Sequence, residues 1–362
     1  MMKRSPWLLG GVVPLLAFAL PVQAADVDKF LPDHTEAVVT LNVKQLVHGG
    51  LMKKFGVEPL QQAMKDCGEC KKLLESLGVD PLADLNRVTV AAAINGDKPF
   101  GVVIIHGRFD TAQFQKGAKG LAKDHDEVVK MHKAGDRRYY EVVAPGEHGS
   151  FQIGSGLKTD KAGATVPVFA FAGNGSPLDL PGSFFFGLVD KGTLILASEK
   201  EALLDSFDRA ESPKKPTLKK SVRRAIEESD SKQSLWMVAR MSALTEKDAT
   251  AEAEEPEEPT RISAVTGGVT IGDDVKIHVT LTAVNIDAAK DVMKDVEDLR
   301  TRLTGLAMLL SGTQKDCTCL MDIPKALKPT RKGKTITVEG QLDGELLEQV
   351  IGVIEKVQQS EQ

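Results

Sequence analysis

The sequence predicts an α+β fold built from two related halves, each a mainly antiparallel sheet with helices packed on one face. Three observations predict it. A strand–turn–strand–helix unit occurs twice, hairpins take the place of strict βαβ crossovers, and apolar and polar residues alternate along the strands. With 362 residues the chain is long enough for about two domains or one duplicated domain.

The N-terminus has the pattern of a secretory signal peptide. Lys3 and Arg4 precede the apolar run Trp7–Leu20, and Val22–Ala24 is a small-residue processing pattern. The run contains Pro14 and is shorter than the roughly 20 residues of a membrane-spanning helix. We therefore expect residues 1–24 to be cleaved after Ala24, leaving an exported chain in the periplasm or outside the cell. An uncleaved N-terminal anchor is the alternative, and no Cys follows the cleavage position as it would in a lipoprotein.

The composition excludes several classes of protein. Cleavage would remove Lys3 and Arg4 and change the net charge from −5 to −7. A mildly acidic chain lacks the basic footprint of a nucleic-acid-binding protein. No apolar run after residue 24 approaches the length of a membrane span, so we expect no transmembrane segment after cleavage.

The repeated unit aligns Val88–Asp110 with Val265–Asp287 without gaps. Each copy predicts a strand, a tight turn, a second strand and a helix. The turns are Asn95–Asp97 and Gly272–Asp274, whose residue types suit two-residue hairpins. Asp110 and Asp287 are predicted to accept hydrogen bonds from the first N–H groups of the helix that follows.

Further elements recur around this unit. A strand precedes it in each half, at Ala37–Val43 and Leu235–Met241, and a second hairpin follows it, at Val128–Val143 and Leu327–Gln341. Strand Lys276–Ala283 alternates apolar and polar residues, which indicates one buried and one wet face. The halves are then residues 25–230 and 231–362.

The halves differ in their insertions. A helix is predicted around Glu58–Leu77 in the first half, whereas residues 245–260 of the second are acidic and proline-containing and predict a disordered loop. Ala144–Gly182 is a Gly- and Pro-rich insertion. Ser198–Glu201 has the pattern of a capping box, and Gly344–Val357 predicts a final amphipathic helix.

Four cysteines occur in two close pairs, Cys67 with Cys70 and Cys317 with Cys319. In an exported protein such pairs indicate disulfides, and three connectivities are open. Bonds between the pairs would join the halves, and bonds within each pair would be local. A zinc ion held by four thiolates and free thiols are further alternatives. Redox catalysis is disfavoured, because Cys67 lies inside a predicted helix between acidic neighbours that raise a thiol pKa.

Motifs for catalysis are absent from the sequence. It contains no Gly-x-Ser-x-Gly elbow, phosphate-binding loop or His-x-x-x-His pair. His106 is interpreted as a half-buried histidine at a strand end, His278 as a surface residue and Asp124–Glu127 as a helix-end loop. No catalytic, cofactor-binding or metal-binding residue is therefore assigned, and no cofactor is expected.

The most distinctive charge pattern is a basic segment before and within a predicted helix. It is interpreted as solvated surface charge or as a docking patch for an anionic polymer, a membrane surface or the acidic loop. Its residues are Lys214, Lys215, Lys219, Lys220, Arg223 and Arg224. Glu227 and Glu228 follow at spacings that allow ion pairs one helical turn apart.

Three segments, Phe30–Val43, Lys232–Trp236 and Thr266–Lys276, resemble those of uncharacterised exported proteins of planctomycete-type bacteria. The resemblance extends over most of the chain after residue 24 and rests on strand and turn patterns. It implies export and carries no known activity or catalytic residues. The cysteine pairs and the acidic loop have no counterpart in it.

These observations favour a non-catalytic binding or structural module of the cell envelope, with an envelope protein or polymer of unknown identity as its partner. A concave sheet face or a cleft between the halves would form the contact, and the 144–182 insertion would be a variable contact loop. The alternatives are an envelope hydrolase with its site between the halves, and a thiol or zinc protein that uses the cysteine pairs.

Overall fold

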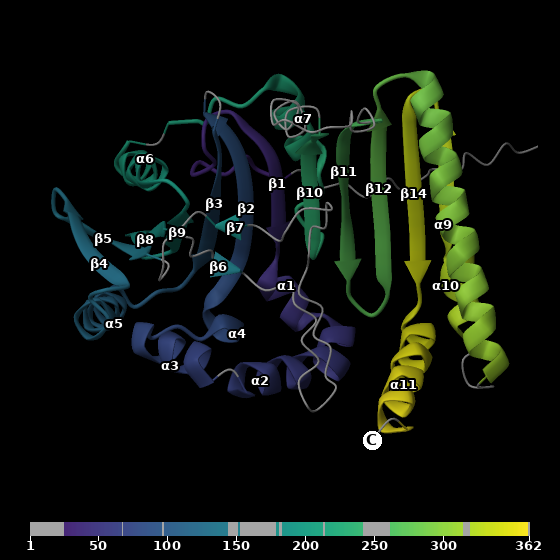
Figure 1. Cartoon of the computed structure of the whole chain (residues 1–362), viewed down its shortest axis with the longest axis horizontal. Helices are drawn as coiled ribbons and strands as arrows, with labels where there is room; N and C mark the ends of the chain where they lie inside the picture. Colours follow the sequence, from purple (N-terminus) through teal and green to yellow (C-terminus); the bar gives the residue numbers. More distant parts are fainter. Residues whose placement is uncertain are drawn as a thin grey trace, which may run out of the picture.

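One continuous antiparallel sheet runs through the molecule (Figure 1). The computed structural model describes residues 25–66, 68–95, 98–143, 151–152, 179–180, 183–212, 214–241, 261–313 and 319–360. The sheet has twelve strands and is accompanied by helices, which confirms the predicted α+β class and its antiparallel character.

The strands of both predicted halves belong to this one sheet. In spatial order they are β13 (Leu327–Lys332), β14 (Thr335–Leu342), β12 (Val275–Ala283), β11 (Ile262–Ile271), β10 (Leu235–Arg240), β1 (Thr35–Leu41), β2 (Leu85–Asn95), β3 (Lys98–Gly107), β9 (Thr193–Ala197), β8 (Ser183–Asp190), β5 (Arg137–Val143) and β4 (Val129–Ala134). The prediction of a separate sheet in each half is replaced by one sheet because β1 pairs with β10 along Ala37–Leu41. A separate two-stranded pair joins β6 (Phe151–Gln152) to β7 (Asp179–Leu180).

The predicted hairpins are confirmed. β2 pairs with β3, β4 with β5, β11 with β12 and β13 with β14, and residues 96–97 of the predicted first turn lie outside the described residues. Gly135 and Gly333 occupy the β4–β5 and β13–β14 turns with φ of 60° and 62°. This left-handed conformation favours glycine because it has no Cβ.

Helices occupy the connections between strands and the C-terminus. They are α1 (Val43–His48), η1 (Met52–Gly56), α2 (Val57–Asp66), α3 (Gly68–Leu77), α4 (Pro81–Asp84), α5 (Thr111–Asp124), α6 (Lys200–Glu211), α7 (Lys220–Glu228), α9 (Ile286–Thr313), α10 (Asp322–Ala326) and α11 (Gly344–Ser360). The single helix predicted around residues 58–77 is therefore two helices, α2 and α3. α11 confirms the predicted C-terminal helix.

Of three predicted helix caps, one is confirmed and two are wrong. Asp110 caps α5 by accepting hydrogen bonds from the N–H groups of Ala112 and Gln113. At α9 this role belongs to Asn285, which accepts from the Ala288 N–H at 2.7 Å, whereas Asp287 pairs with Lys290. The Ser198 hydroxyl accepts from the Gly101 N–H of β3, so the expected capping box at α6 does not form.

Helices pack against both faces of the sheet, which corrects the prediction of helices on one face. On β9, Ile195 faces a core that includes Leu203 and Phe207 of α6, while Leu194 faces a core that includes Phe114 of α5. Neighbouring strand residues point to opposite faces, and here both are apolar, so both faces need cover.

Several predicted segments lie outside the described residues. These are the signal peptide at 1–24, the acidic loop at 245–260 and, except for β6 and β7, the insertion at 144–182.

Candidate functional site

One face of the sheet is apolar across almost its whole width. Residues directly opposite each other on paired strands share a face, so the strand registers define rows of side chains. One row consists of Met131, Tyr140, Phe186, Leu196, Val103, Val90, Val39, Met237, Gly267, Val279 and Val338. We call this side of the sheet the apolar face.

The opposite face changes character between the two parts of the chain. On this opposite face, the row of side chains under α6 and α7 is apolar and includes Val38, Ala91 and Val102. Beyond β10 the same row continues as Thr266, Thr280 and Thr337, which tolerate water. In β11, β12 and β14 it is therefore the apolar face whose exposure to water costs free energy.

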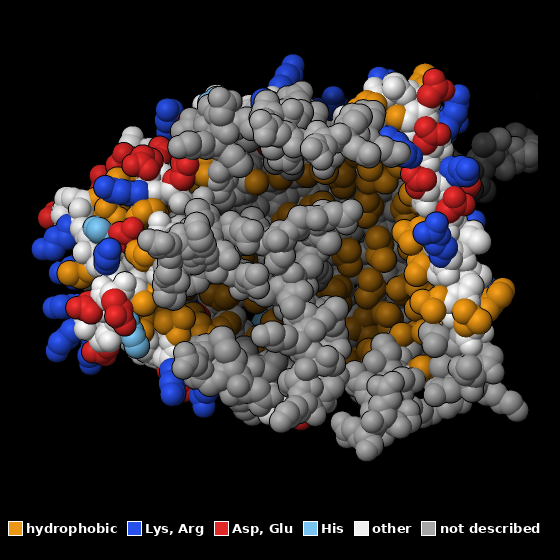
Figure 2. Space-filling model, viewed as in Figure 1, with side chains coloured by type: hydrophobic (Ala, Val, Ile, Leu, Met, Phe, Trp, Pro, Cys, Tyr) orange, Lys and Arg blue, Asp and Glu red, His pale blue; other side chains and the backbone are white. Residues whose placement is uncertain are grey.

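The described helices cover this apolar face at its two edges. α5 packs over Tyr140 at one edge, and the N-terminal part of α9 packs over Ile336 at the other. Between them Figure 2 shows a hollow over β11, β12 and β14 whose floor consists of hydrophobic side chains. The floor residues are half-buried and comprise Val265, Val269, Ile277, Val279, Leu281 and Val338.

Helix α9 forms the wall of the hollow. An apolar stripe runs along it with alternating spacings of three and four residues, through Ala289, Val292, Val296, Leu299, Leu303 and Leu306. Its first members pack on the sheet, with Ala289 fully buried. Leu299, Leu303 and Leu306 continue the same stripe beyond this contact and are 58%, 37% and 54% exposed.

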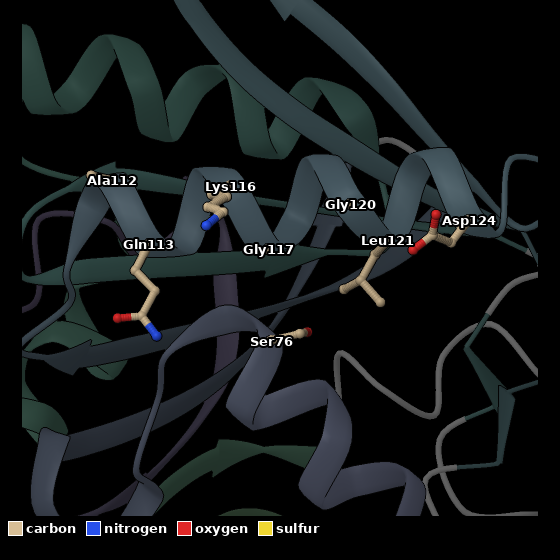
Figure 3. A pocket seen from close by; sticks show the side chains of 8 residues that line it. All are labelled: Ser76, Ala112, Gln113, Lys116, Gly117, Gly120, Leu121 and Asp124. Carbon is tan, nitrogen blue, oxygen red and sulfur yellow. The ribbon is translucent and has the colours of Figure 1, made fainter.

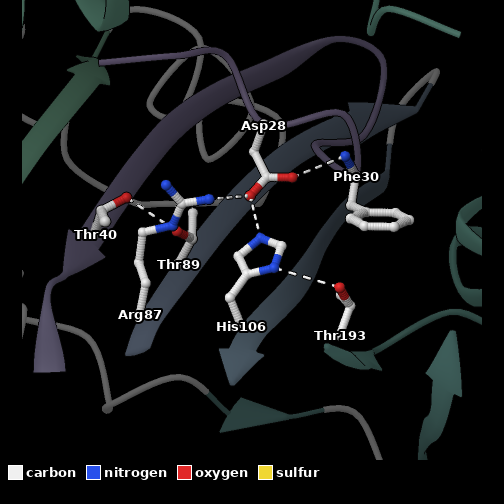
Figure 4. Close-up of polar contacts among 7 residues, drawn as sticks. All are labelled: Asp28, Phe30, Thr40, Arg87, Thr89, His106 and Thr193. Atoms are coloured by element: carbon white, nitrogen blue, oxygen red, sulfur yellow. Dashed lines mark hydrogen bonds and ion pairs between the residues drawn. The ribbon is translucent and has the colours of Figure 1, made fainter. Parts of the chain in front are cut away.

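A second candidate is a polar cluster around Asp28 (Figure 4). Asp28 lies in the segment before β1 and meets two strands. Its Oδ2 lies 2.5 Å from His106 Nε2 on β3 and 2.9 Å from Arg87 Nη2 on β2, and its Oδ1 accepts from the Phe30 N–H. His106 Nδ1 lies 3.3 Å from Thr193 Oγ1.

This cluster holds Asp28 as a carboxylate. Burial alone raises the pKa of Asp28, but the hydrogen bond and charge of His106, the Phe30 N–H and Arg87 together lower it below its ordinary value of 3.8. The cluster therefore ties the N-terminal segment to the sheet. His106 is half-buried and hydrogen-bonded, which confirms its interpretation from the sequence.

The order Thr193–His106–Asp28 has the chemical components of a nucleophile, a base and an orienting carboxylate. Thr193, however, is only 3% exposed inside β9, so a substrate has no access to its hydroxyl. Arg87 also neutralises the carboxylate that would orient the base. This geometry supports a structural link and not a catalytic site.

The basic segment is partly occupied by internal contacts. Lys219 and Arg240 both pair with Glu36, a carboxylate only 2% exposed, and the Arg223 guanidinium donates to the Pro216 carbonyl. Arg224 pairs with Glu228 one turn later, as the spacing predicts.

The other basic residues of the proposed anion-docking patch are exposed, namely Lys214, Lys215 and Lys220. Helix α7 begins at Lys220, so Lys214, Lys215 and Lys219 precede it. Lys219 and Arg223 thus contact groups of the fold, whereas the Arg224–Glu228 pair is itself exposed.

The cysteine pairs are only partly within the described residues. Cys319 is buried among Val353, Leu346 and Val350 of α11 and its own neighbour Leu320. The side chains of Cys67, Cys70 and Cys317 lie outside the described residues, so the disulfide and zinc alternatives stay predictions.

A recess lies between α3 and α5, lined by Ser76, Gln113, Lys116, Gly120 and other residues of α5 (Figure 3). It exists because Gly117 allows α5 to cross close to α3. A Cβ at Gly117 would lie 1.8 Å from the Ser76 carbonyl oxygen, whereas one at Gly120 would meet no atom within 4 Å. The recess shows how the helices pack and presents no catalytic set.

Across the described residues, no three His, Cys, Asp or Glu side chains converge as metal ligands would. Nor does any described helix combine the length and hydropathy needed to span a bilayer. The sequence predicts a concave sheet face as a contact surface, but it does not reveal the position of the apolar hollow. The alternation in Lys276–Ala283 predicts which residues of that strand lie on the apolar face. Whether that face is covered depends on where the helices pack.

Comparisons with known proteins identify no family. No family model and no curated protein matches the chain. Among solved structures, crystal form III of TP0453 aligns with 91% of this chain and 98% of its own, at 10% identity and a TM-score of 0.43. Crystal form IV of TP0453 aligns with 91% and 97%, at 11% identity and a TM-score of 0.42. Similarity at this level carries no information about what either chain binds.

Proposed function

We propose that this chain is an exported, non-catalytic binding protein of the cell envelope that holds an apolar ligand, of the acyl-chain class, in the hollow of its apolar sheet face. The observation that carries the proposal is the half-buried floor of β11, β12 and β14 beside the leucine-lined wall of α9. Apolar surface recessed in this way gains free energy when a ligand displaces water from it.

The chemistry of the hollow restricts the ligand. The floor residues carry no charge and no hydrogen-bonding side chain, and the wall adds leucines. Specific recognition of a polar group by the floor is therefore not expected. A flexible hydrocarbon chain can make apolar contacts with such a surface while its polar end remains in water.

The proposal includes a duplicated origin for the fold. In support, β1, β2, β3, α5 and the β4–β5 hairpin follow one another in the same order as β10, β11, β12, α9 and the β13–β14 hairpin. The two sets extend in opposite directions from the β1–β10 pair. Strands β8 and β9 are then an addition to the first half.

Export and disulfides are the parts of the proposal that a mass measurement tests. Full-length precursor would be expressed in an export-competent host and weighed before and after reduction. We expect a chain that begins at Ala25 and is lighter by four hydrogens before reduction. An intact N-terminus would contradict cleavage, and four free thiols or bound zinc would contradict the disulfides.

Ligand binding is tested with a fluorescent fatty acid, cis-parinaric acid. We expect saturable binding by the wild-type protein. Val279→Asn places an amide in the floor and should weaken binding at least tenfold. Thr280→Asn introduces the same amide on the opposite face of the same strand and should leave binding unchanged, because neighbouring strand residues face opposite sides.

A wall variant separates the hollow from other apolar surfaces. Leu303→Asn should also weaken binding, whereas Thr301→Asn, an exposed neighbour on α9, should not. Equal affinity of Val279→Asn and the wild type, with both folded by circular dichroism, would rule out the hollow as the binding site.

A further inference from the structure

Exposed apolar side chains are concentrated on the C-terminal half of α9. Nine large apolar side chains of the described residues are exposed, and five of them lie between Leu299 and Leu309. Scattered apolar residues are ordinary on protein surfaces, but a contiguous group indicates an interaction site.

These five side chains do not all point the same way. Leu299, Leu303 and Leu306 belong to the stripe that lines the hollow. Met308 and Leu309 lie off that stripe, since each residue turns about 100° around a helix. They are 57% and 73% exposed and, about 100° apart around the helix, add apolar side chains to the outer side of α9. Figure 2 shows hydrophobic side chains protruding from this part of the molecule.

The charge around this outer surface is positive. Residues 299–309 contain Arg300 and Arg302 and no acidic residue, and both arginines are exposed. Within the described residues neither guanidinium has a carboxylate partner at ion-pair distance. By contrast, the N-terminal half of α9 exposes several aspartates.

We propose that the C-terminal half of α9 docks this protein on an anionic lipid bilayer, with Met308 and Leu309 entering the interface and Arg300 and Arg302 contacting lipid phosphates. An amphipathic helix with apolar and cationic residues side by side is suited to lie in the plane of the interface. Anionic headgroups attract such cations near the surface. The acidic N-terminal half of α9 would be kept away from the bilayer.

A second copy of the chain fits this surface less well. A twofold axis through residues 299–309 would bring Arg300 and Arg302 of one copy close to the same cations of the other. The docking proposal does not depend on an apolar ligand in the hollow, because Met308 and Leu309 lie outside it.

The test is vesicle flotation of the full chain. Vesicles of phosphatidylcholine alone are compared with vesicles containing three parts phosphatidylglycerol to seven of phosphatidylcholine. We expect binding to the anionic vesicles, weaker binding to the neutral ones, and loss of the difference in 0.5 M salt, which screens charges over a few ångströms. Residues 1–24 are the same in every variant, so differences between variants report on α9.

Two variants and two controls make the result specific. Leu309→Glu should weaken binding to anionic vesicles at least tenfold, and Arg300→Gln with Arg302→Gln should remove the preference for phosphatidylglycerol. Leu73→Glu on α3 replaces a leucine that is 45% exposed, and Lys119→Gln with Lys123→Gln removes two exposed cations of α5. These controls should bind as the wild type does.

The proposal fails if no binding to anionic vesicles occurs, or if Leu309→Glu floats as well as Leu73→Glu. It also fails if Leu309→Glu changes only the oligomeric state measured by light scattering, which would assign the surface to a second copy. All substituted side chains are exposed, and thermal unfolding of each variant verifies that it is folded.

Discussion

Asp28 carries a charged link between the N-terminal segment and the sheet. Its carboxylate is 8% exposed and contacts both Arg87 and His106. Asp28→Asn keeps the shape but removes the charge, and we expect it to lower the free energy of unfolding by about 2 kcal/mol at pH 7, since hydrogen bonds to charged groups contribute about that much. Urea unfolding measures the change.

The pH dependence of this loss follows from the lowered pKa of Asp28. A carboxyl whose folded-state pKa lies below the ordinary 3.8 stabilises the protein above pH 3.8 and loses that contribution as the pH falls through the folded-state value. The gap between wild type and Asp28→Asn should therefore close in acid. Asp26→Asn, an exposed neighbour, should match wild type throughout, and a gap that stays constant to pH 2 would contradict the link.

In contrast to the Asp28 carboxylate, the buried hydroxyl of Tyr140 has no hydrogen-bond partner within the described residues. The residue is 1% exposed, and within the described residues its hydroxyl makes no hydrogen bond. Burial raises the pKa of the phenol above its ordinary value of 10.0, despite the nearby charge of Arg138.

Tyr140→Phe should leave the free energy of unfolding unchanged or raise it by about 1 kcal/mol, because it removes an unpaired buried group and keeps the ring. The stability lost as the pH rises above 10 should also shrink, since a phenol with a raised folded-state pKa favours the folded state only while protonated. Thermal unfolding at pH 7 and pH 10.5 tests both. A loss above 1 kcal/mol at pH 7 would mean that the hydroxyl has a partner.

At the scale of elements, two glycines of α5 differ in their surroundings. Gly117→Ala would drive a Cβ into the Ser76 backbone, and overpacking of this kind costs about 1–3 kcal/mol. Gly120→Ala meets open space and should stabilise α5 by roughly 1 kcal/mol through helix propensity. Chemical denaturation of the two variants should give changes of opposite sign. Equal effects would contradict the close crossing of α3 and α5.

The elements that the sequence predicts well are local ones. Hairpins such as β4–β5 depend on a few turn residues and on alternation, and Asp110 caps α5 through bonds to residues two and three positions away. The capping box at Ser198 failed because a distant strand, through the Gly101 N–H, competes for the same hydroxyl. Local preference is decided by tertiary contacts that a single sequence does not display.

The candidate sites were harder to predict for the same reason. His106 was identified as half-buried, but its partner Asp28 lies 78 residues away in the chain. The hollow depends on which strands become neighbours and on where α9 stops covering them. The apolar spacing of α9 is a sequence signal that the prediction did not use, and spacing alone does not separate buried from exposed members.

At the scale of the whole molecule, the sheet makes the two parts of the chain one cooperative unit. The β1–β10 pair joins them, and one core cluster contains Val38 of β1, Ile104 of β3 and Trp236 of β10 together with α6 and α7. Unfolding either part would expose this shared core. We therefore expect one unfolding transition in urea and not two.

Trp236 provides a suitable probe, because it is 5% exposed in the shared core. With Trp7 replaced by Phe, its fluorescence reports on the core alone, while circular dichroism reports on all helices and strands. The two curves should coincide in midpoint and slope, as two-state unfolding requires. If circular dichroism showed a second transition without a fluorescence change, the strands beyond β10 would unfold separately. The apolar floor of the hollow would then lose stability independently of the core, and an apolar ligand should shift that second transition selectively to higher urea, because a ligand stabilises only the unit that binds it.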